Sequence, residues 1–376
     1  MLVSVILLLF SCPLSASAAE AFSAEDMAAL DSVTAELSSD FAAYEQYFSL
    51  SALWERVKSG ELPLDLEGIW QLLQQLFLAE IAGCGKLLAE LALLSIIAVL
   101  LGNLASSFGN GSISRLAQMI IYLLLLGIAA IGFKNSAALA GDAVASSSDF
   151  LFALLPMLMT FMAAMGNVAA VTLMNPALLF ALTLVTGLLS NIIFPLIYFS
   201  GVLKLLSCLS PQFNVDKLAR LGKSTALGLL TISAGLFVSF LSIGGIASAS
   251  ASGLAVKAAK AAGSIFIPVV GKSLADALDS VIGVSLVLKN GIGIFGVIVI
   301  LLYTAYPAVK ILVISLIYKL TGALLEPMGE SRLSSALYEI GGVLQSLFAA
   351  VAIGGLFFFF VLALVVCMGN FAMMMR

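Results

Sequence analysis

The chain has 376 residues, of which 62% are hydrophobic and only 10% are charged. Soluble domains carry about 25% charged residues, so this composition excludes an ordinary soluble globular protein and predicts a polytopic membrane protein. The charge is uneven, because residues 20–67 carry eleven acids against Arg56 and Lys58, whereas residues 68–376 carry a net +5. This distribution offers no basic patch for nucleic acid.

The residue types exclude most catalytic and metal-binding chemistry. The sequence has no histidine, which rules out Ser-His-Asp and Cys-His nucleophile systems and HExxH zinc sites. Its four cysteines are far apart and form no CxxC pair. Gly222-Lys223-Ser224 and Gly271-Lys272-Ser273 lack the upstream glycine of a phosphate-binding loop. We therefore predict no enzyme activity, no catalytic residues, no cofactor and no metal site.

The N-terminus has the pattern of a signal peptide. Residues 2–10 form an apolar run that is too short to cross about 30 Å of hydrocarbon. Ala16-Ser17-Ala18 fits a cleavage site. We predict a signal peptide over residues 1–18; because no Lys or Arg precedes the run, an uncleaved anchor is the alternative.

Two polar segments follow the signal peptide. Residues 19–65 are acidic and predict a small extracytoplasmic segment. Over residues 66–86, apolar side chains recur at helical spacing opposite a Gln-rich face, with Trp70 among them. This pattern favours an amphipathic helix lying in the membrane interface, although a packed helix of the extracytoplasmic segment would give the same pattern.

Residues 87–376 form the predicted multi-pass transmembrane domain, an all-α helical bundle. Prolines inside the apolar blocks favour broken, kinked or re-entrant helices. Pro156/Pro195 and Pro268/Pro307 repeat at an offset of 112 residues, which suggests a tandem repeat or a coincidence. The apolar blocks are 87–104, 116–133, 150–203, 226–246, 264–325 and 342–368.

Charge asymmetry gives a predicted orientation. With the N-terminus extracytoplasmic, residues 134–149 form an outside loop, and the basic segments 204–223 and 319–339 lie inside. Lys257 and Lys260, in the outside segment 247–263, run against this assignment.

The most informative polar cluster lies in residues 266–290. Lys272, Asp276 and Asp279 fall on one helical face, with Lys289 further along. Ionisable groups at the bilayer centre cost several kcal/mol, so this face is either a polar path or gate in a re-entrant or pore-lining helix, or the wet side of a surface helix. Lys310, four residues after Tyr306, is a second candidate for a polar path and is otherwise a snorkelling lysine.

The sequence resembles the stage III sporulation protein AE family of endospore-forming bacteria over roughly residues 80–376. The segments that carry the resemblance are LLPMLMTFMAAMGNV (154–168), NIIFPLIYFSGVL (191–203), FIPVVGKSLADALDSVIGVSLVLKN (266–290), YPAVKILVISLIYKL (306–320) and EPMGE (326–330).

This resemblance implies a non-enzymatic membrane subunit of a sporulation channel or secretion-like complex. The expected location is the mother-cell outer forespore membrane, and the expected role is forespore development after engulfment. The implied partners are other stage III sporulation membrane proteins and, through them, a forespore membrane partner. The alternative is a permease-like secondary transporter of a small solute.

The predicted translocation of the N-terminus is open to a direct test. In Ser38→Cys, a membrane-impermeant thiol reagent should label the new thiol in intact protoplasts, because the acidic segment lies outside. Labelling that occurs only after lysis would reverse the predicted orientation.

Overall fold

The computed structural model describes residues 74, 77–107, 112–165, 168–209, 215–237, 239, 270–328 and 331–374. These residues are helical almost throughout, which confirms the all-α prediction. The predicted signal peptide and acidic segment lie outside the described residues. The elements are α5 (Gly85–Ser107), α6 (Ser112–Ala164), α7 (Val168–Leu188), the π-helical η1 (Leu189–Ile193), α8 (Phe194–Leu209), α10 (Val270–Leu325), the 3-10 turn η2 (Glu326–Met328) and α11 (Ser331–Met374), with a further helix over residues 216–237.

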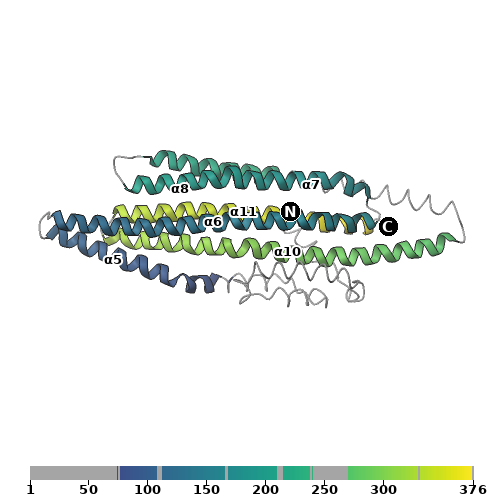
Figure 1. Cartoon of the computed structure of the whole chain (residues 1–376), viewed down its shortest axis with the longest axis horizontal. Helices are drawn as coiled ribbons and strands as arrows, with labels where there is room; N and C mark the ends of the chain where they lie inside the picture. Colours follow the sequence, from purple (N-terminus) through teal and green to yellow (C-terminus); the bar gives the residue numbers. More distant parts are fainter. Residues whose placement is uncertain are drawn as a thin grey trace.

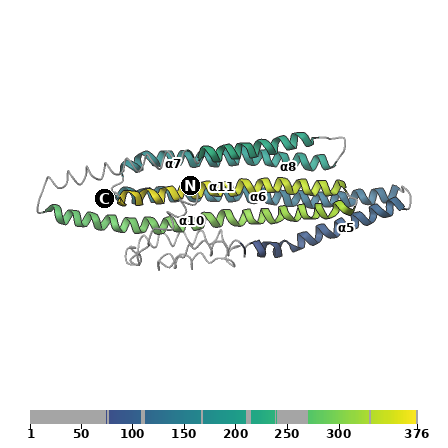
Figure 2. The same cartoon turned by 180° about the vertical axis from the view of Figure 1, so that it is seen from behind.

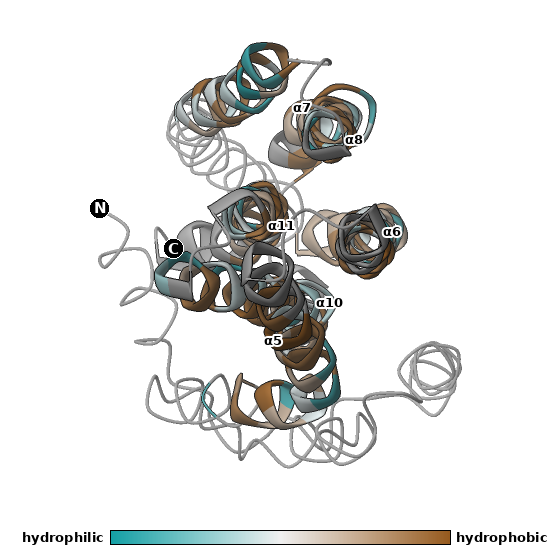
Figure 3. Ribbon diagram, turned by 90° about the vertical axis from the view of Figure 1, so that its left-hand side faces the viewer, coloured by the Kyte–Doolittle hydropathy of each residue, from teal (hydrophilic) through white to brown (hydrophobic). Residues whose placement is uncertain are grey.

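The described helices run along one long axis, and α5 with α6 and α10 with α11 form antiparallel pairs (Figure 1). In Figure 1, α6, α10 and α11 lie side by side, while α7 and α8 follow one another in a row beside the helix over residues 216–237. Seen from behind, the hairpin of α5 and α6 projects beyond the ends of α10 and α11 (Figure 2). Viewed end-on, α11 lies between the α7–α8 row and α10 (Figure 3).

Four helical segments of the described chain are long and apolar enough to cross a membrane. They comprise Tyr122–Ala164, Val171–Ser207, Gly291–Leu325 and Leu333–Val366. The shortest of them has 34 residues and would be about 50 Å long, against about 30 Å of hydrocarbon. The bundle is therefore longer than one bilayer is thick, so part of each helix lies outside the hydrocarbon or is strongly tilted.

Residues 134–149 do not form the predicted loop. These residues continue the 53-residue helix α6 without a break, so 116–133 and 150–164 cannot be two antiparallel crossings. The physical reason is helix propensity, because five of these sixteen residues are alanine, the strongest helix former.

The two basic segments 204–223 and 319–339, in contrast, lie at the same end of the bundle (Figure 1), as the charge asymmetry requires. Neither is a simple loop, since most of their residues belong to helices. Lys257 and Lys260 lie outside the described residues.

Prolines do not break the helices where the sequence suggested. Pro156, Pro176 and Pro307 lie inside α6, α7 and α10, and the boundary between α6 and α7 falls instead between Ala164 and Val168. A π-helical turn, in which Phe194 N–H donates to Leu189 O, precedes Pro195. Such a bulge accommodates a missing backbone donor without ending the helix.

The predicted tandem repeat does not appear in the backbone of the described residues. The offset of 112 residues places the boundary between α6, which ends at Ala164, and α7, which begins at Val168, over residues 276–280, which are helical within α10. Pro268 lies outside the described residues.

Glycines allow α10 and α11 to approach closely. A Cβ on Gly322 would lie 2.8 Å from Ser334 O and 2.9 Å from Tyr338 N, and one on Gly355 would lie 2.7 Å from Thr304 Cβ. Close backbone approach of this kind is typical of helices packed within membranes. The α10–α11 hairpin is therefore the most tightly joined part of the bundle.

Gly322→Ala should destabilise the purified protein by about 1–3 kcal/mol, because the backbone of α11 would have to move. The matched control is Gly228→Ala, since a Cβ there meets nothing within 4 Å and alanine favours the helix by about 1 kcal/mol. Thermal unfolding in detergent compares the two variants. Equal melting temperatures would contradict the close packing.

Candidate functional site

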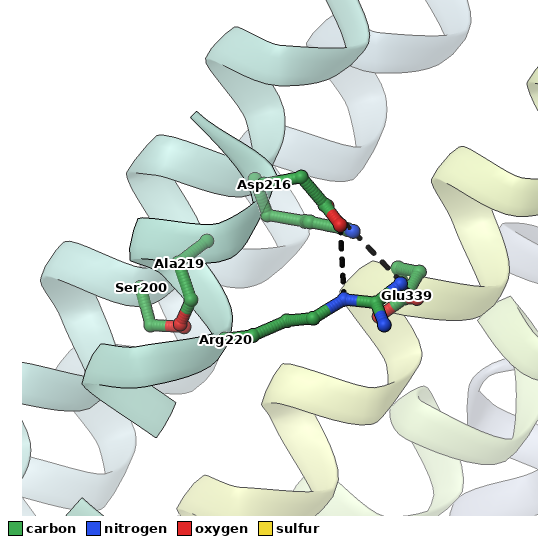
Figure 4. A network of polar contacts seen from close by, with 6 residues as sticks. Ser200, Asp216, Ala219, Arg220 and Glu339 are labelled. Atoms are coloured by element: carbon green, nitrogen blue, oxygen red, sulfur yellow. Dashed lines mark hydrogen bonds and ion pairs between the residues drawn. The ribbon is translucent and has the colours of Figure 1, made fainter. Parts of the chain in front are cut away.

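An ionic cluster joins three elements at the basic end of the bundle. Lys204, near the end of α8, forms an ion pair and hydrogen bond with Asp216 at the start of the helix over residues 216–237. Its Nζ also lies 3.6 Å from Glu339 Oε1 on α11. Arg220 contacts both acids, with Nε 2.9 Å from Asp216 Oδ2 and Nη2 3.4 Å from Glu339 Oε1 (Figure 4). The cluster therefore couples α8, the following helix and α11.

Burial makes Lys204 the centre of this cluster. Its side chain is 9% exposed, whereas that of Arg220 is 68% exposed. A buried ammonium group is tolerated only when it is paired and hydrogen-bonded, and two carboxylates from two different elements meet this need. The exposed Arg220 contributes less, because solvent screens its charge.

The cluster is held in place by hydrogen bonds between helices. Ser200 Oγ donates to Ala219 O at 2.6 Å, which joins α8 to the helix over residues 216–237. Ser315 Oγ donates to Gly341 O at 2.7 Å between α10 and α11. Because both bonds lie within one or two turns of the charges, the four elements meet in fixed register there.

The neighbouring basic residues complete the site. Lys319 of α10 donates to Gln345 Oε1, and its Nζ lies 5.5 Å from the centroid of the Tyr338 ring. Lys223 is partly buried beside Gly342. Burial lowers the pKa of Lys223, and the charges of Lys319 and Lys204 lower it further against the opposing effect of Glu339.

Asp216 shows how the cluster depends on pH. The hydrogen bond from Lys204 lowers the pKa of this carboxyl below its usual value, against the opposing effect of burial, and the charges of Lys204 and Arg220 lower it further. Because the folded-state pKa is the lower one, this stabilisation is present above about pH 4 and is lost as the pH falls through the folded-state value.

Of the predicted polar-path residues, the structure gives contacts for Lys310. Its Nζ lies 3.5 Å from Glu80 Oε1, which precedes α5, and 3.2 Å from the Tyr306 hydroxyl. The Glu80 side chain is 13% exposed, so the lysine has an acidic partner inside the bundle rather than snorkelling alone. Glu80 also accepts from Cys84 Sγ at 3.5 Å.

The other predicted polar-path residues, Lys272, Asp276, Asp279 and Lys289, lie on α10, which runs unbroken from Val270 to Leu325. Their segment is thus the first part of a long helix and not a separate re-entrant one. Their side chains lie outside the described residues, so the polar path stays a prediction.

Sequence reasoning missed the ionic cluster. The charge asymmetry predicts only a basic inside segment for Lys204 and Arg220, whereas they lie on two packed helices. A local signal existed in Asp216 and Arg220, which are four residues apart and form an ion pair. The pairing of Lys204 with Glu339 joins residues distant in sequence and leaves no local signal.

A second set of charges faces away from the bundle. Lys134, Asp142 and Asp149 are exposed on α6 within the candidate span Tyr122–Ala164. Ala138 and Ala145 lie between them on the same exposed face. This acidic face of α6, defined by Asp142 and Asp149, has no ion-pair partner among the described residues.

Among the residues that the structure describes, no group of three or more Cys, Asp or Glu side chains could hold a metal ion. The site is thus a set of ion pairs between helices, and its chemistry is electrostatic.

Comparison with known proteins gives a clear similarity. A family model described as Stage III sporulation protein AE matches residues 48–369, a range that includes the whole ionic cluster. Stage III sporulation protein AE of Bacillus subtilis (strain 168) is 35% identical over 297 residues, which is 79% of this chain and 74% of that protein. No solved structure is significantly similar to the chain.

Lys204→Met should cost about 3 kcal/mol of stability, because it leaves Asp216 and Glu339 close together with only the exposed Arg220 between them. Arg220→Gln, the control in the same cluster, should cost at most about 1 kcal/mol. Thermal unfolding in detergent at neutral pH measures both. Equal, small effects would show that the cluster does not hold the helices together.

Proposed function

The chain belongs to the Stage III sporulation protein AE family, and we propose that it serves sporulation as a non-enzymatic subunit of a channel or secretion-like membrane complex. The proposed location is the outer forespore membrane on the mother-cell side, with an extracytoplasmic N-terminus. The proposed partners are other stage III sporulation membrane proteins and, through them, a protein of the forespore membrane.

The observation that carries this proposal is the acidic face of α6. Asp142 and Asp149 are exposed in the middle of a candidate membrane span. A charge facing lipid costs several kcal/mol, so such residues in membrane proteins face a partner or a wet cavity. A subunit of a larger assembly presents such a face to its neighbour.

The small residues of the same face fit this interpretation. Ala138 and Ala145 allow another helix to approach closely, and the neighbouring carboxylates would then be paired across the contact. The buried Lys204 and the partly exposed Lys310 are instead paired within the chain. The carboxylates without an ion-pair partner therefore lie on the outer surface of α6.

A polar path through the complex is the second part of the proposal. Lys272, Asp276, Asp279 and Lys289 share the N-terminal part of α10, and we place them along a wet passage or its gate. Lys310 lies further along the same helix and is tied to Glu80.

Replacing Asp142 and Asp149 together by Asn tests the subunit role. In sporulating cells this variant should reach normal levels, lose the stage III membrane proteins that co-purify with the wild type, and fail to form spores after engulfment. Vegetative growth should be unchanged. The control is Glu90→Gln, which removes a half-exposed acid from α5 and should keep partners and spore yield.

Two results would contradict the proposal. Normal spore yield and normal co-purification in the double variant would show that the acidic face of α6 contacts no partner. A vegetative growth defect on deletion of the whole gene, as severe as the sporulation defect, would favour a housekeeping transporter.

A further inference from the structure

The ionic cluster and the two lysines beside it together carry more positive charge than the nearby acids neutralise. Lys204, Arg220, Lys223 and Lys319 bring four positive charges to the region, against the two carboxylates of Asp216 and Glu339. Both carboxylates are already engaged by Lys204 and Arg220. No carboxylate of the described residues lies within ion-pair distance of Lys223 or Lys319.

These two lysines flank one turn of α11. A Cβ on Gly342 would lie 3.2 Å from Lys223 Nζ, and one on Gly341 would lie 2.7 Å from Lys319 Cγ. The glycine pair thus allows a lysine from each neighbouring helix to lie against the backbone of α11. Their charges are close enough to repel, which contributes to the lowered pKa of Lys223. A bound anion would relieve this repulsion.

The depth of the cluster along the bundle indicates which anion. Lys319 lies six residues before the end of the span Gly291–Leu325, and Lys204 lies three residues before the end of Val171–Ser207. Both are therefore within about 10 Å of the ends of candidate spans, the depth at which we expect lipid headgroups. Tyr338 is 52% exposed beside Lys319, and tyrosine is enriched at this depth.

Apolar surface adjoins Lys319. Leu316 and Leu320, on either side of Lys319 along α10, are 46% and 52% exposed. A ligand with both a phosphate and an acyl chain would contact the amino groups with one part and these leucines with the other. Free phosphate would contact only the amino groups.

We propose that Lys223 and Lys319 bind the phosphate of an anionic phospholipid at the Gly341–Gly342 turn of α11. The two ammonium groups donate to the phosphate oxygens, and an acyl chain lies along Leu316 and Leu320. Basic pockets between transmembrane helices recognise anionic headgroups in this way. The bound lipid supplies negative charge where α10, α11 and the helix over residues 216–237 meet.

Native mass spectrometry of the purified full chain tests this inference, with dioleoyl phosphatidylglycerol and dioleoyl phosphatidylcholine as the probes. The wild type should retain the anionic lipid in preference to the zwitterionic one. Lys223→Gln/Lys319→Gln should bind the anionic lipid about 30-fold more weakly, if each lysine contributes as cations near a membrane surface do. Lys223→Arg/Lys319→Arg keeps the charge and should retain the preference.

The matched control is Lys86→Gln/Lys134→Gln, which removes two exposed lysines from α5 and α6 and should leave lipid retention unchanged. If Lys223→Gln/Lys319→Gln does not yield folded protein, Lys319→Gln alone serves in its place, because Lys319 is only partly buried. Unchanged retention in a folded Gln variant overturns the proposal. Equal retention of both lipids would also overturn it, because the site would then not select an anionic headgroup. Full displacement of the anionic lipid by millimolar inorganic phosphate would do the same, because the site would then recognise phosphate and not a phospholipid.

Discussion

A charge inside an apolar bundle must be paired, and the pairing of Lys204 fixes much of this structure. Its side chain is almost fully buried, yet its partners come from two other elements, Asp216 and Glu339. Removing either acid would leave an ammonium group partly uncompensated in a medium where that is costly. The position of α8 therefore depends on that of α11, and the hydrogen bonds of Ser200 and Ser315 keep the register in which the charges meet.

The same constraint distinguishes the interior of the bundle from its surface. The buried Lys204 and the partly exposed Lys310 are both paired with acids of the same chain. On the outer surface, the acidic face of α6 and the lysines beside Gly341–Gly342 lack acidic or basic partners within the described residues. We propose that a neighbouring subunit pairs with the acidic face of α6 and that a lipid phosphate pairs with the two lysines. Both follow from charge that has no opposite-charge partner within ion-pair distance among the described residues, on helices that are mostly apolar.

The sequence was sufficient for the fold class and the family but not for the helix boundaries. Hydrophobicity alone predicted a helical membrane bundle, and long matching segments such as 154–168 carried the family resemblance. Charge counts placed the two basic segments at one end. The prediction of a loop at residues 134–149 was wrong because the helix propensity of the alanines there outweighs the polarity of the segment. The prolines did not break the helices as predicted, because a π-helical turn, as before Pro195, and packing against neighbouring helices can accommodate a proline within a helix. The ionic cluster could not be predicted, since Lys204 and Glu339 meet only through tertiary packing.

A charge swap at the centre of the cluster tests the account most directly. Lys204→Asp would place a third carboxylate beside Asp216 and Glu339, and it should lower both protein level and spore yield. Adding Asp216→Lys to the same chain restores an opposite-charge pair between α8 and the next helix, and the account predicts recovery of both readouts toward the wild type. If the swapped chain is as defective as the single variant, the ion pair does not join these helices and the central claim is wrong.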